Sequence, residues 1–447
     1  MTATSPPLAP LLEKLDRRSA HVGVIGLGYV GLPLAVTCAQ RGLHVTGFDI
    51  DPPKIDKLRN DDSYIDAVDP AELRRLNTGG RTRWTSDFSA LAEMDVIVIC
   101  VPTPLSKNRD PDLSFVATTA ETIARYIRPG SLVVLESTTY PGTTIELLKP
   151  ILEKSGLVCG QDIFLGFSPE REDPGNASYR TATIPKIVAG DGDDARQAVT
   201  AFYRIAVDNV VPVSTTQTAE AVKITENIFR AVNIALVNEL KVIFDAMGID
   251  LWEVIDGAAT KPFGFMPFYP GPGLGGHCIP IDPFYLTWKA REYDLTTRFI
   301  ELAGEINSNM PQYVVSRLRE VLDRATGKGL SQSHILIVGM SYKKNVADMR
   351  ESPSARLMEL LLDQGAQVDF LDPHVATIPP MRAYPQLLNR SAIAPDQVAA
   401  AGFDAILIAT DHDAIDYAAL TALNIPIIDT RNAIARRDLA MDNVTKA

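Results

Sequence analysis

The stretch from His21 to Asp51 constrains the fold more than any other part of the chain. It reads HVGVIGLGYVGLPLAVTCAQRGLHVTGFDID, which is a short apolar strand, a glycine-rich turn, a helix that Gly42 ends, and a second strand. Two strands joined by a helix pair in parallel, because the helix provides the crossover between them. The segment therefore predicts the start of a parallel α/β sheet.

Four further apolar runs, rich in β-branched residues, extend this pattern. They are DVIVICVPTP (95–104), SLVVLESTTYPGT (131–143), DIFLGFSPE (162–170) and IPKIVAG (184–190). Strands that helices cover on both faces read as continuous apolar runs rather than alternating ones. A doubly wound parallel sheet is expected in this first part of the chain.

From about residue 215 the pattern changes to long helices and later returns to strands. TAEAVKITENIFRAVNIALVNELKVIFDAMGID carries apolar residues three and four apart, which predicts one long amphipathic helix whose apolar stripe favours a homodimer or a higher homo-oligomer. HILIVGMSYKKNVADMRESPSARLMELLLDQGAQVDFLDPHV then repeats the opening order. We expect an α/β protein with two Rossmann-like doubly wound parallel-sheet domains, 1–213 and 326–447, joined by a central helical domain, 214–325.

Charge and cysteine usage narrow the class of protein. The net charge is −12 and the pI about 5.1, which argues against nucleic acid or an acidic membrane surface as the main partner. No apolar run approaches the ~20 residues of a membrane helix, and the first residues lack a secretory signal. The four cysteines, without a CxxC pair, fit a reducing compartment, so a cytoplasmic protein is expected.

The turn after the first strand carries Gly26, Gly28 and Gly31 in the GxGxxG spacing, and Asp49 ends the second strand. Glycines there let the backbone approach a pyrophosphate, and the helix N-terminus attracts its charge. An acid at this spacing binds a ribose hydroxyl and repels a 2′-phosphate, so NAD is favoured over NADP. The alternative is a packing turn that binds nothing.

A second glycine-rich segment, GPGLGGHCIPIDP (271–283), contains Cys278. A metal site is not expected, because no second cysteine or histidine lies at ligand spacing apart from the adjacent His277. A buried structural cysteine is the common fate of a free thiol, and we expect it for Cys38, Cys100 and Cys159. For Cys278 the setting favours a nucleophile beside an NAD site, where a thiolate adds to an aldehyde and the adduct gives up a hydride.

The chain resembles the UDP-glucose/GDP-mannose dehydrogenase family, the nucleotide-sugar 6-dehydrogenases, from about Val22 to Asn432. The resemblance rests on GLGYVGLPLA, VPTP, GFSPEREDPG, AEAVKITENIFRAVNIALVNEL, GPGLGGHCIPIDP and GMSYKKNVADMRESP. It implies an N-terminal NAD domain, a central dimerising domain and a C-terminal domain that binds the UDP part. It also implies oxidation of a sugar C6 alcohol to a carboxylate with two NAD+ and one catalytic cysteine.

The resemblance assigns roles to individual residues. It implies Cys278 as nucleophile, Lys223 and Asn227 holding the C6 oxygen, and Glu170 activating the water that hydrolyses a thioester. Asp282 orients the thiol region, or is a helix cap. Thr138 positions a water or contacts the cofactor, with Thr139 as its substitute. The cofactor-binding set is Gly26, Gly28, Tyr29, Val30, Gly31, Asp49, Lys54, Val101, Pro102, Thr103, Thr138 and Arg350.

A UDP-sugar is the implied substrate. Its binding set is Glu170, Arg171, Lys223, Asn227, Tyr269, Gly271, Gly273, Gly275, Tyr342, Lys343 and Arg431. Lysine and arginine suit a pyrophosphate. Each of these charged residues has an ordinary surface charge as its alternative.

Two positions bear on which sugar is oxidised. His277 stands where the UDP-glucose branch usually has serine, and Ile281 stands where that branch tends to have lysine. The segment is most similar to the branch acting on UDP-N-acetylhexosamines, especially UDP-N-acetyl-D-glucosamine. UDP-N-acetylmannosamine or UDP-glucose oxidation, a non-catalytic NAD-binding regulatory protein and a two-electron hydroxy-acid dehydrogenase stay open as alternatives.

Overall fold

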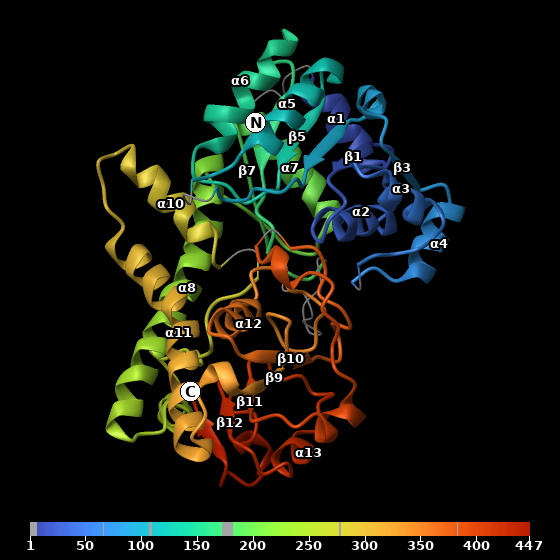
Figure 1. The fold of residues 1–447 in the computed structure, drawn as a ribbon. Coiled ribbons are helices and arrows are strands. Elements are labelled where there is room, and N and C mark those ends of the chain that lie inside the picture. Colours follow the sequence, from blue (N-terminus) through green and yellow to red (C-terminus); the bar gives the residue numbers. More distant parts are fainter. Residues whose placement is uncertain (1–6, 66, 107–109, 172–181, 277–278, 382) are drawn as a thin grey trace. The chain divides into compact units, whose positions relative to one another are not determined.

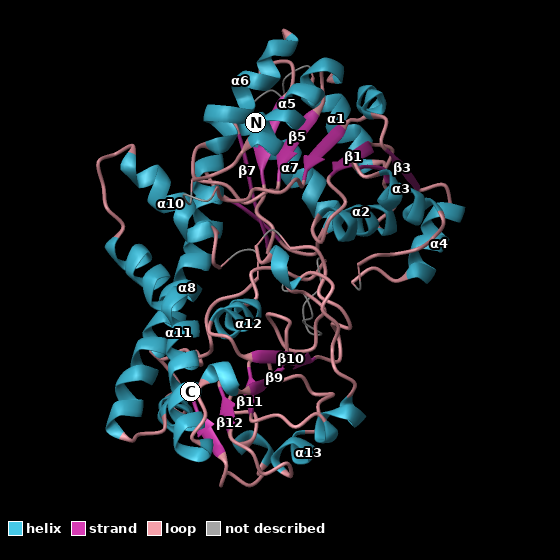
Figure 2. Cartoon of the chain, viewed as in Figure 1, coloured by secondary structure: helices cyan, strands magenta, loops and turns pink. Residues whose placement is uncertain are grey.

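The structure is a computed structural model, and it describes residues 7–65, 67–106, 110–171, 182–276, 279–381 and 383–447 (Figure 1). The chain divides into two compact units. The first comprises residues 1–226 with 284–295, and the second comprises residues 227–283 with 296–447. Each unit contains one β-sheet with helices on both of its faces (Figure 2).

The first unit is built on an eight-stranded sheet of order β3-β2-β1-β4-β5-β6-β7-β8. Its strands are β1 (His21–Ile25), β2 (His44–Phe48), β3 (Thr82–Thr85), β4 (Val96–Ile99), β5 (Leu132–Leu135), β6 (Phe164–Phe167), β7 (Lys186–Gly190) and β8 (Val210–Pro212). The strand order reverses between β1 and β4, so a crevice for a ligand is expected at the carboxyl ends of these two strands.

Alternate residues of the central strands enter two different cores. Val96 and Val98 of β4 pack in the core that contains residues of α1 (Leu8–Asp16), α2 (Gly31–Gln40) and α7 (Asp193–Ala206). Ile97 and Ile99 pack on the other face, against α5 (Ser114–Tyr126). This is the reason that the strand sequence is apolar at every position. The remaining helices of this unit are α3 (Pro52–Arg59), α4 (Pro70–Thr78) and α6 (Lys149–Leu152).

Two strands depart from the predicted parallel pattern, because β8 pairs parallel with the reversed strand β7. β7 pairs antiparallel with β6, with Gly166 opposite Gly190 and Phe167 opposite Ala189. The sequence between these strands, SPEREDPGNASYRTATIP, has no apolar periodicity that could form a crossover helix, and an antiparallel neighbour needs none. As a result β7 begins at the sheet edge where β5 and β6 end.

Four of the described helices belong to the middle of the chain. α8 (Thr216–Met247) is the predicted long helix, and its residues pass from the first unit to the second after position 226. α9 (Leu251–Ala259) and α11 (Arg298–Thr326) lie in the second unit, and α10 (Asp282–Arg291) passes into the first.

The second unit holds a five-stranded, fully parallel sheet of order β10-β9-β11-β12-β13. Alternation again sends Ile335 and Ile337 into one core and Leu336 and Val338 into the other. The first of these cores includes residues of α11 and α12, and the second includes residues of α13. The elements are β9 (His334–Val338), α12 (Pro353–Asp363), β10 (Gln367–Leu371), β11 (Ala405–Ile408), α13 (Tyr417–Thr421), β12 (Ile427–Asp429) and β13 (Val444–Lys446).

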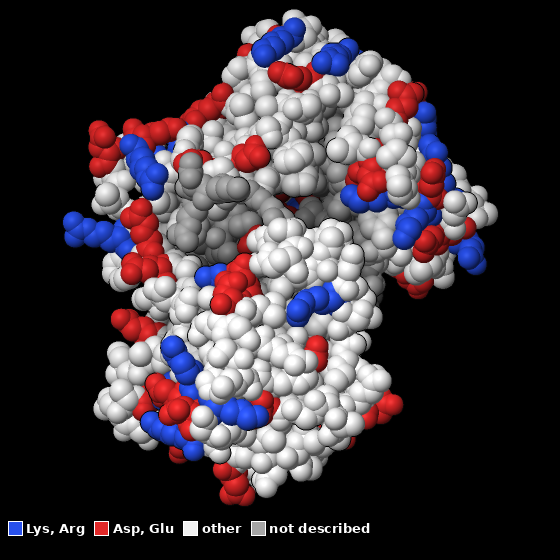
Figure 3. All heavy atoms as spheres, viewed as in Figure 1, with Lys and Arg blue, Asp and Glu red and all other residues white. Residues whose placement is uncertain are grey.

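The charged surface is mixed in sign. On the face drawn in Figure 3, acidic and basic side chains of the described residues are interspersed. Among the helices that the structure describes, none combines the length and apolar character needed to span a membrane.

Candidate active site

The glycine turn after β1 leaves an open space at one of its three glycines. Gly26 has φ +91°, and a Cβ there would lie 2.5 Å from the Cys100 carbonyl oxygen. A Cβ on Gly31 would lie 1.9 Å from the Gly26 oxygen, whereas one on Gly28 would meet nothing within 4 Å. The fold itself therefore explains Gly26 and Gly31. Gly28 faces free space at the start of α2, which fits a pyrophosphate that approaches the backbone.

Asp49 closes the same turn from the end of β2. Its carboxylate accepts hydrogen bonds from the amides of Leu27 and Asp51, each at 3.0 Å, and pairs with the Lys54 ammonium at 3.4 Å. A carboxylate accepts about four hydrogen bonds, so Asp49 keeps capacity for a ribose hydroxyl. The predicted neighbours Gly26, Gly28, Asp49 and Lys54 are thus brought together in the first unit.

The equivalent acid in the second sheet, Asp372 after β10, is fully engaged by protein. Its six donors are the amides of Met340, Ser341, His374 and Val375, the Ser341 hydroxyl and the His412 ring. His412 Nδ1 accepts from the Asn345 amide, so Nε2 carries the proton that Asp372 accepts. Burial opposes the charge of Asp372, but these donors lower its pKa to about 2. Asp372 is therefore not available to bind a ribose hydroxyl.

Several polar residues lie in the loops that follow β4 and β5 in the first unit. The Ser137 hydroxyl donates to the Val101 carbonyl at 2.6 Å, and the Tyr285 hydroxyl donates to the Thr103 carbonyl at 2.8 Å. Thr139 is completely buried, and its hydroxyl has no partner in the described structure, whereas Thr138 is partly exposed. Of the two, Thr138 is the one that a ligand can reach.

Glu170 lies just beyond the end of β6 in a cluster that sequence reasoning missed. Lys186, the first residue of β7, places its ammonium 3.3 Å from Glu170 Oε2 and 2.9 Å from Glu136 Oε1. Tyr203 of α7 donates its hydroxyl to the same Glu136 oxygen. A signal existed in the sequence, because Lys186 interrupts the apolar run IPKIVAG and Glu136 directly follows the run LVVL.

The two predicted polar residues of α8 are both buried. Lys223 belongs to the first unit, and Asn227 belongs to the second. Asn227 Nδ2 donates to Asp282 Oδ2 at 2.5 Å, and its Oδ1 accepts from Arg230. Asp282 is the first residue of α10. Its place at the start of a helix is therefore compatible with its contact with Asn227.

The glycine loop packs closely on the second sheet's turn region, within the second unit. A Cβ on Gly275 would lie 2.5 Å from Tyr342 Cβ, and one on Gly271 would lie 2.5 Å from Arg431 Nη1. The Gly276 amide donates to the Arg350 carbonyl at 2.9 Å. The loop thus joins Tyr342, Arg350 and Arg431, three residues predicted to contact ligands.

Arg431 is suited to an anion. Its Nε donates to the Ala409 carbonyl at 2.8 Å, which fixes the guanidinium plane against Gly271. Burial lowers the pKa of Arg431, and the carboxylates of Asp411 and Asp429 oppose this shift. The adjacent Asn432 has a buried side-chain oxygen without a hydrogen-bond partner in the described structure. These features fit the phosphates and a donor group of a nucleotide.

Two buried side-chain amides hold the start of the glycine loop, and neither could be predicted from the sequence pattern. Asn238 Oδ1 on α8 accepts from the Gly271 amide at 3.1 Å, and its Nδ2 donates to Asn307 Oδ1 at 2.8 Å. Asn307 on α11 donates in turn to the Ala231 carbonyl at 3.0 Å. An asparagine in an amphipathic helix is ordinarily a surface residue, so the sequence pattern alone does not predict this buried contact.

Cys278 and His277 lie outside the described residues. The other three cysteines are free thiols, of which Cys38 and Cys159 are buried and Cys100 is partly exposed. Burial, reinforced by Glu136, raises the pKa of Cys38 to about 12, and burial raises that of Cys159 to about 12. Burial likewise raises the pKa of Cys100 well above its ordinary value. None of these three is a thiolate at neutral pH. Among the described residues, no group of histidine, cysteine and carboxylate side chains could hold a metal ion.

Comparison with known proteins assigns the family. The chain matches three domain models of the UDP-glucose/GDP-mannose dehydrogenase family: the NAD binding domain over residues 20–207, the central domain over 217–309 and the UDP binding domain over 336–436. The protein belongs to this family. The predictions of the family, of the α/β fold with two parallel-sheet domains and of NAD as cofactor are confirmed, and the protein is an oxidoreductase of the nucleotide-sugar dehydrogenase type.

Individual relatives cover almost the whole chain. A UDP-N-acetyl-D-glucosamine 6-dehydrogenase from Pseudomonas aeruginosa is 37% identical over 399 residues, 88% of this chain and 91% of the relative. A UDP-N-acetyl-D-mannosamine dehydrogenase from Methanococcus maripaludis is 33% identical, with 92% of each chain covered. The structure of the UDP-D-ManNAc dehydrogenase from Pyrococcus horikoshii is 33% identical and superposes with a TM-score of 0.83 over 93% of this chain and 96% of that chain.

Proposed function

We propose that the protein oxidises the C6 alcohol of UDP-N-acetyl-D-glucosamine to the uronic acid in an NAD-dependent, four-electron reaction. The observation that carries this proposal is the glycine loop, which leads directly to Cys278 and packs on Tyr342 and Arg431 of the UDP binding domain. Residues 271–276, which precede the proposed nucleophile, therefore pack on two residues proposed to bind the nucleotide. A two-electron alcohol dehydrogenase needs no cysteine nucleophile, so that reaction would leave Cys278 without a role.

The residues of the first unit fit NAD in the turn between β1 and α2. The open space at Gly28 would admit the pyrophosphate, and Asp49 would bind a ribose hydroxyl. When bound, NAD+ accepts the hydride that leaves C6 in each of the two oxidation steps. Tyr29, Val30, Val101, Pro102, Thr103 and Arg350 stay predicted cofactor contacts.

The remaining chemistry falls to side chains of this chain. In the first step the alcohol loses its proton and a hydride, which leaves an aldehyde, and Lys223 and Asn227 would stabilise its oxygen. The Cys278 thiolate then forms a C–S bond to C6, and loss of the hydroxyl proton with a second hydride converts this adduct to a thioester.

Hydrolysis completes the cycle. A water oxygen forms a C–O bond to C6 while the C–S bond breaks and the thiolate leaves, and Glu170 takes a proton from that water. Thr138 would orient the water, and Asp282, held by Asn227, would orient the thiol region. Arg171, Tyr269, Gly273 and Lys343 stay predicted substrate contacts.

The choice of sugar rests on the 37% identity to the Pseudomonas aeruginosa enzyme and on His277 and Ile281. The mannosamine epimer is the second candidate, because the Methanococcus maripaludis relative and the Pyrococcus horikoshii structure, both named for that substrate, match at 33% identity. The test is NADH formation with limiting UDP-N-acetylglucosamine, UDP-N-acetylmannosamine or UDP-glucose. Two NADH per UDP-N-acetylglucosamine, with little from the others, is expected. Turnover of another sugar alone would overturn the choice of substrate.

A homodimer is part of the same proposal. Phe229, Leu236 and Ile243 are exposed on α8 at seven-residue spacing, which places them on one face of the helix. Met247 at its end and Phe263 beyond α9 are exposed as well. A second copy of the chain would cover these side chains, and light scattering after gel filtration should give twice the chain mass of 48.6 kDa. The domain boundaries 1–213, 214–325 and 326–447 and the cytoplasmic location stay predictions.

A further inference from the structure

A buried cluster of opposite charges lies at the carboxyl edge of the first sheet, directly behind Glu170. The Lys186 ammonium bridges Glu136 Oε1 at 2.9 Å and Glu170 Oε2 at 3.3 Å. The side chains of Lys186 and Glu136 are 5% and 0% exposed, and that of Glu170 is 11% exposed. Glu170 is thus the member of the cluster nearest to solvent, while the other two lie in the interior.

The topology brings these three residues together for a reason peculiar to this sheet. Glu136 follows β5 and Glu170 follows β6, so both lie at the ends of parallel neighbours. Lys186 lies at the same edge only because β7 is antiparallel to β6 and begins where β6 ends. In a fully parallel sheet the first residue of β7 would lie at the opposite edge.

The cluster holds two carboxylates and one ammonium away from water. Burial raises the pKa of Glu136, Lys186 lowers it, and Glu170 raises it again. For Lys186, burial lowers the pKa, but the charges of Glu136 and Glu170 outweigh burial, so the ammonium stays protonated. Since like charges close together disfavour joint ionisation, the two glutamates compete for one cation. Lys186 is therefore shared between the two carboxylates.

Both oxygens of Glu170 are held by named donors. Oε1 accepts from the Arg171 amide at 2.6 Å, and Oε2 accepts from Lys186. Arg171 is itself fixed by an ion pair with Glu226 of α8 at 2.5 Å. A carboxylate that acts on a water must be fixed in orientation, because small misplacements cost large factors in rate.

We propose that Lys186 is a positioning residue for Glu170, in that it fixes the carboxylate that activates the hydrolytic water, and that Glu136 holds the Lys186 ammonium in place. The inference rests on the proposed role of Glu170 in thioester hydrolysis. The other titratable groups that face the cluster are Cys100 after β4, Cys38 of α2, Tyr203 of α7, and the Arg171–Glu226 pair.

The first test is the steady-state kinetics of acid formation in Lys186→Met and Lys186→Arg. Without the ammonium, Glu170 loses the donor that holds Oε2, so in Lys186→Met kcat falls about 10- to 100-fold, with KM changed less than about threefold. Lys186→Arg, which keeps the charge and a donor, should regain part of the rate. An unchanged kcat in Lys186→Met, or a loss confined to KM, would contradict the inference.

A double variant separates positioning from simple neutralisation of a buried charge. Removing Lys186 alone leaves Glu136 buried and unpaired, which destabilises a protein irrespective of catalysis. Glu136→Gln with Lys186→Met removes both charges, so the melting temperature should recover while acid formation stays slow. If the rate recovers together with the melting temperature, Lys186 only neutralises Glu136. Lys149→Met, which breaks an ion pair with Asp191 beyond the other end of β7, is the matched control and should keep the wild-type rate.

A third measurement does not depend on turnover. If the wild type forms no acid from any of the three sugars, the proposed function fails, yet the Lys186–Glu170 coupling is still measurable. Melting temperatures of Lys186→Met, Glu170→Gln and the double variant form a cycle. The double variant should lose less than the sum of the two single losses. Additive losses would show that Lys186 does not hold Glu170, whatever the substrate is.

Discussion

Gly28 is the glycine of the NAD turn that the protein's own packing does not require. A Cβ at this position meets nothing within 4 Å, so Gly28→Ala should change the free energy of unfolding by no more than about 0.5 kcal/mol. The same Cβ would occupy the space next to the pyrophosphate. We therefore expect NAD affinity to fall about tenfold, a change of about 1.4 kcal/mol in binding free energy. Titration of NAD by protein fluorescence measures this change.

Gly31→Ala is the contrasting variant. Its Cβ would lie 1.9 Å from the Gly26 carbonyl oxygen, so the turn must move and unfolding should become easier by about 3 kcal/mol. Thermal melting separates the two substitutions. If Gly28→Ala bound NAD as tightly as the wild type, the pyrophosphate would not lie at this turn.

Glu220 on α8 gives the protein a pH-dependent stability near neutrality. Burial raises its pKa from 4.5 to about 7, although the Thr144 hydroxyl and the amides of Gly142 and Thr144 donate to it. The folded state therefore binds a proton that the unfolded state releases between these two values. Stability should fall as pH rises from 4.5 to about 7, by about 3 kcal/mol in total.

Glu220→Gln removes this titration. As pH rises through that window, the free energy of unfolding of the wild type should therefore fall relative to that of the variant. Glu72→Gln is the control of opposite sign, because hydrogen bonding to Arg75 lowers the pKa of the partly exposed Glu72. Chemical unfolding at several pH values measures both differences. A wild type that loses no stability against Glu220→Gln over this range would show that Glu220 is ionised throughout.

The link between the long helix and the glycine loop works at the level of whole elements. Asn238 of α8 accepts from the Gly271 amide and donates to Asn307 of α11. Asn238→Ala leaves these partners unpaired, which should lower stability by about 1–3 kcal/mol and raise the KM for the UDP-sugar about tenfold. NAD affinity should not change, because the NAD turn belongs to the other unit.

Asn233→Ala is the matched control for this prediction. Asn233 lies on the same helix, is partly exposed and only donates to the Phe229 carbonyl, one turn earlier, at 2.7 Å. Its replacement should leave both KM and stability near the wild-type values. Equal KM in the two variants would mean that the loop keeps its place without Asn238.

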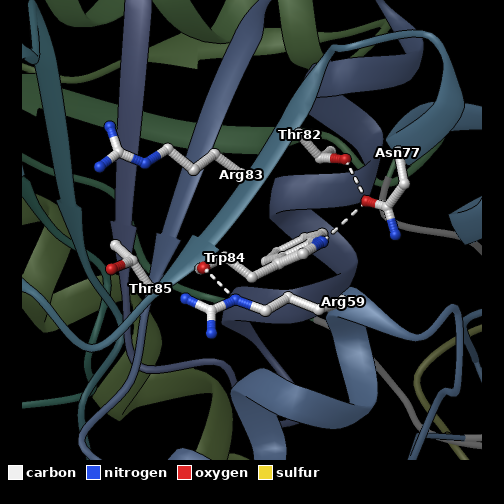
Figure 4. Close-up of a pocket in the computed structure, with 6 residues that line it drawn as sticks. All are labelled: Arg59, Asn77, Thr82, Arg83, Trp84 and Thr85. Carbon is white, nitrogen blue, oxygen red and sulfur yellow. Dashed lines mark hydrogen bonds between the residues drawn. The ribbon is translucent and has the colours of Figure 1, made fainter.

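Most elements could be predicted from the sequence because their patterns are local. The apolar runs that became β1, β4, β5 and β9 are buried on both faces, and α8 shows its helical period over 32 residues. β3 could not be predicted, because its sequence TRWT at the sheet edge is half polar. The shallow pocket beside it, about 380 Å³ and lined by Arg59, Asn77 and Trp84 among others, is formed by side chains that cap this edge (Figure 4).

The direction of β7 was not predicted, because the sequence holds only an indirect signal for it. A strand's own residues do not encode which way it pairs, and only the missing crossover helix indicates it. Lys186 appears in sequence as a polar interruption of a strand, and its partners Glu136 and Glu170 are 50 and 16 positions away. Sequence spacing could place each residue at a strand end. It could not show that three such ends meet in one buried cluster.

At the scale of the whole molecule, the two sheets are similar but differ in the hydrogen bonds that one aspartate accepts. Each ends its second strand with an aspartate that accepts from the turn after the first strand. Asp49 has two amide donors and one lysine, whereas Asp372 has six donors, including His412. A carboxylate that already receives six hydrogen bonds cannot take up a ribose hydroxyl. The duplicated architecture should therefore bind one dinucleotide, not two.

Calorimetric titration with NAD should accordingly give one site per chain. Asp49→Asn should weaken this binding about tenfold or more, because the amide presents one acceptor where the carboxylate presents two. Asp372→Asn should leave both the stoichiometry and the affinity for NAD unchanged while it lowers the melting temperature, since the turn of the second sheet loses its charged acceptor. Two NAD sites per chain in the wild type would show that the engagement of Asp372 does not decide which sheet binds the cofactor.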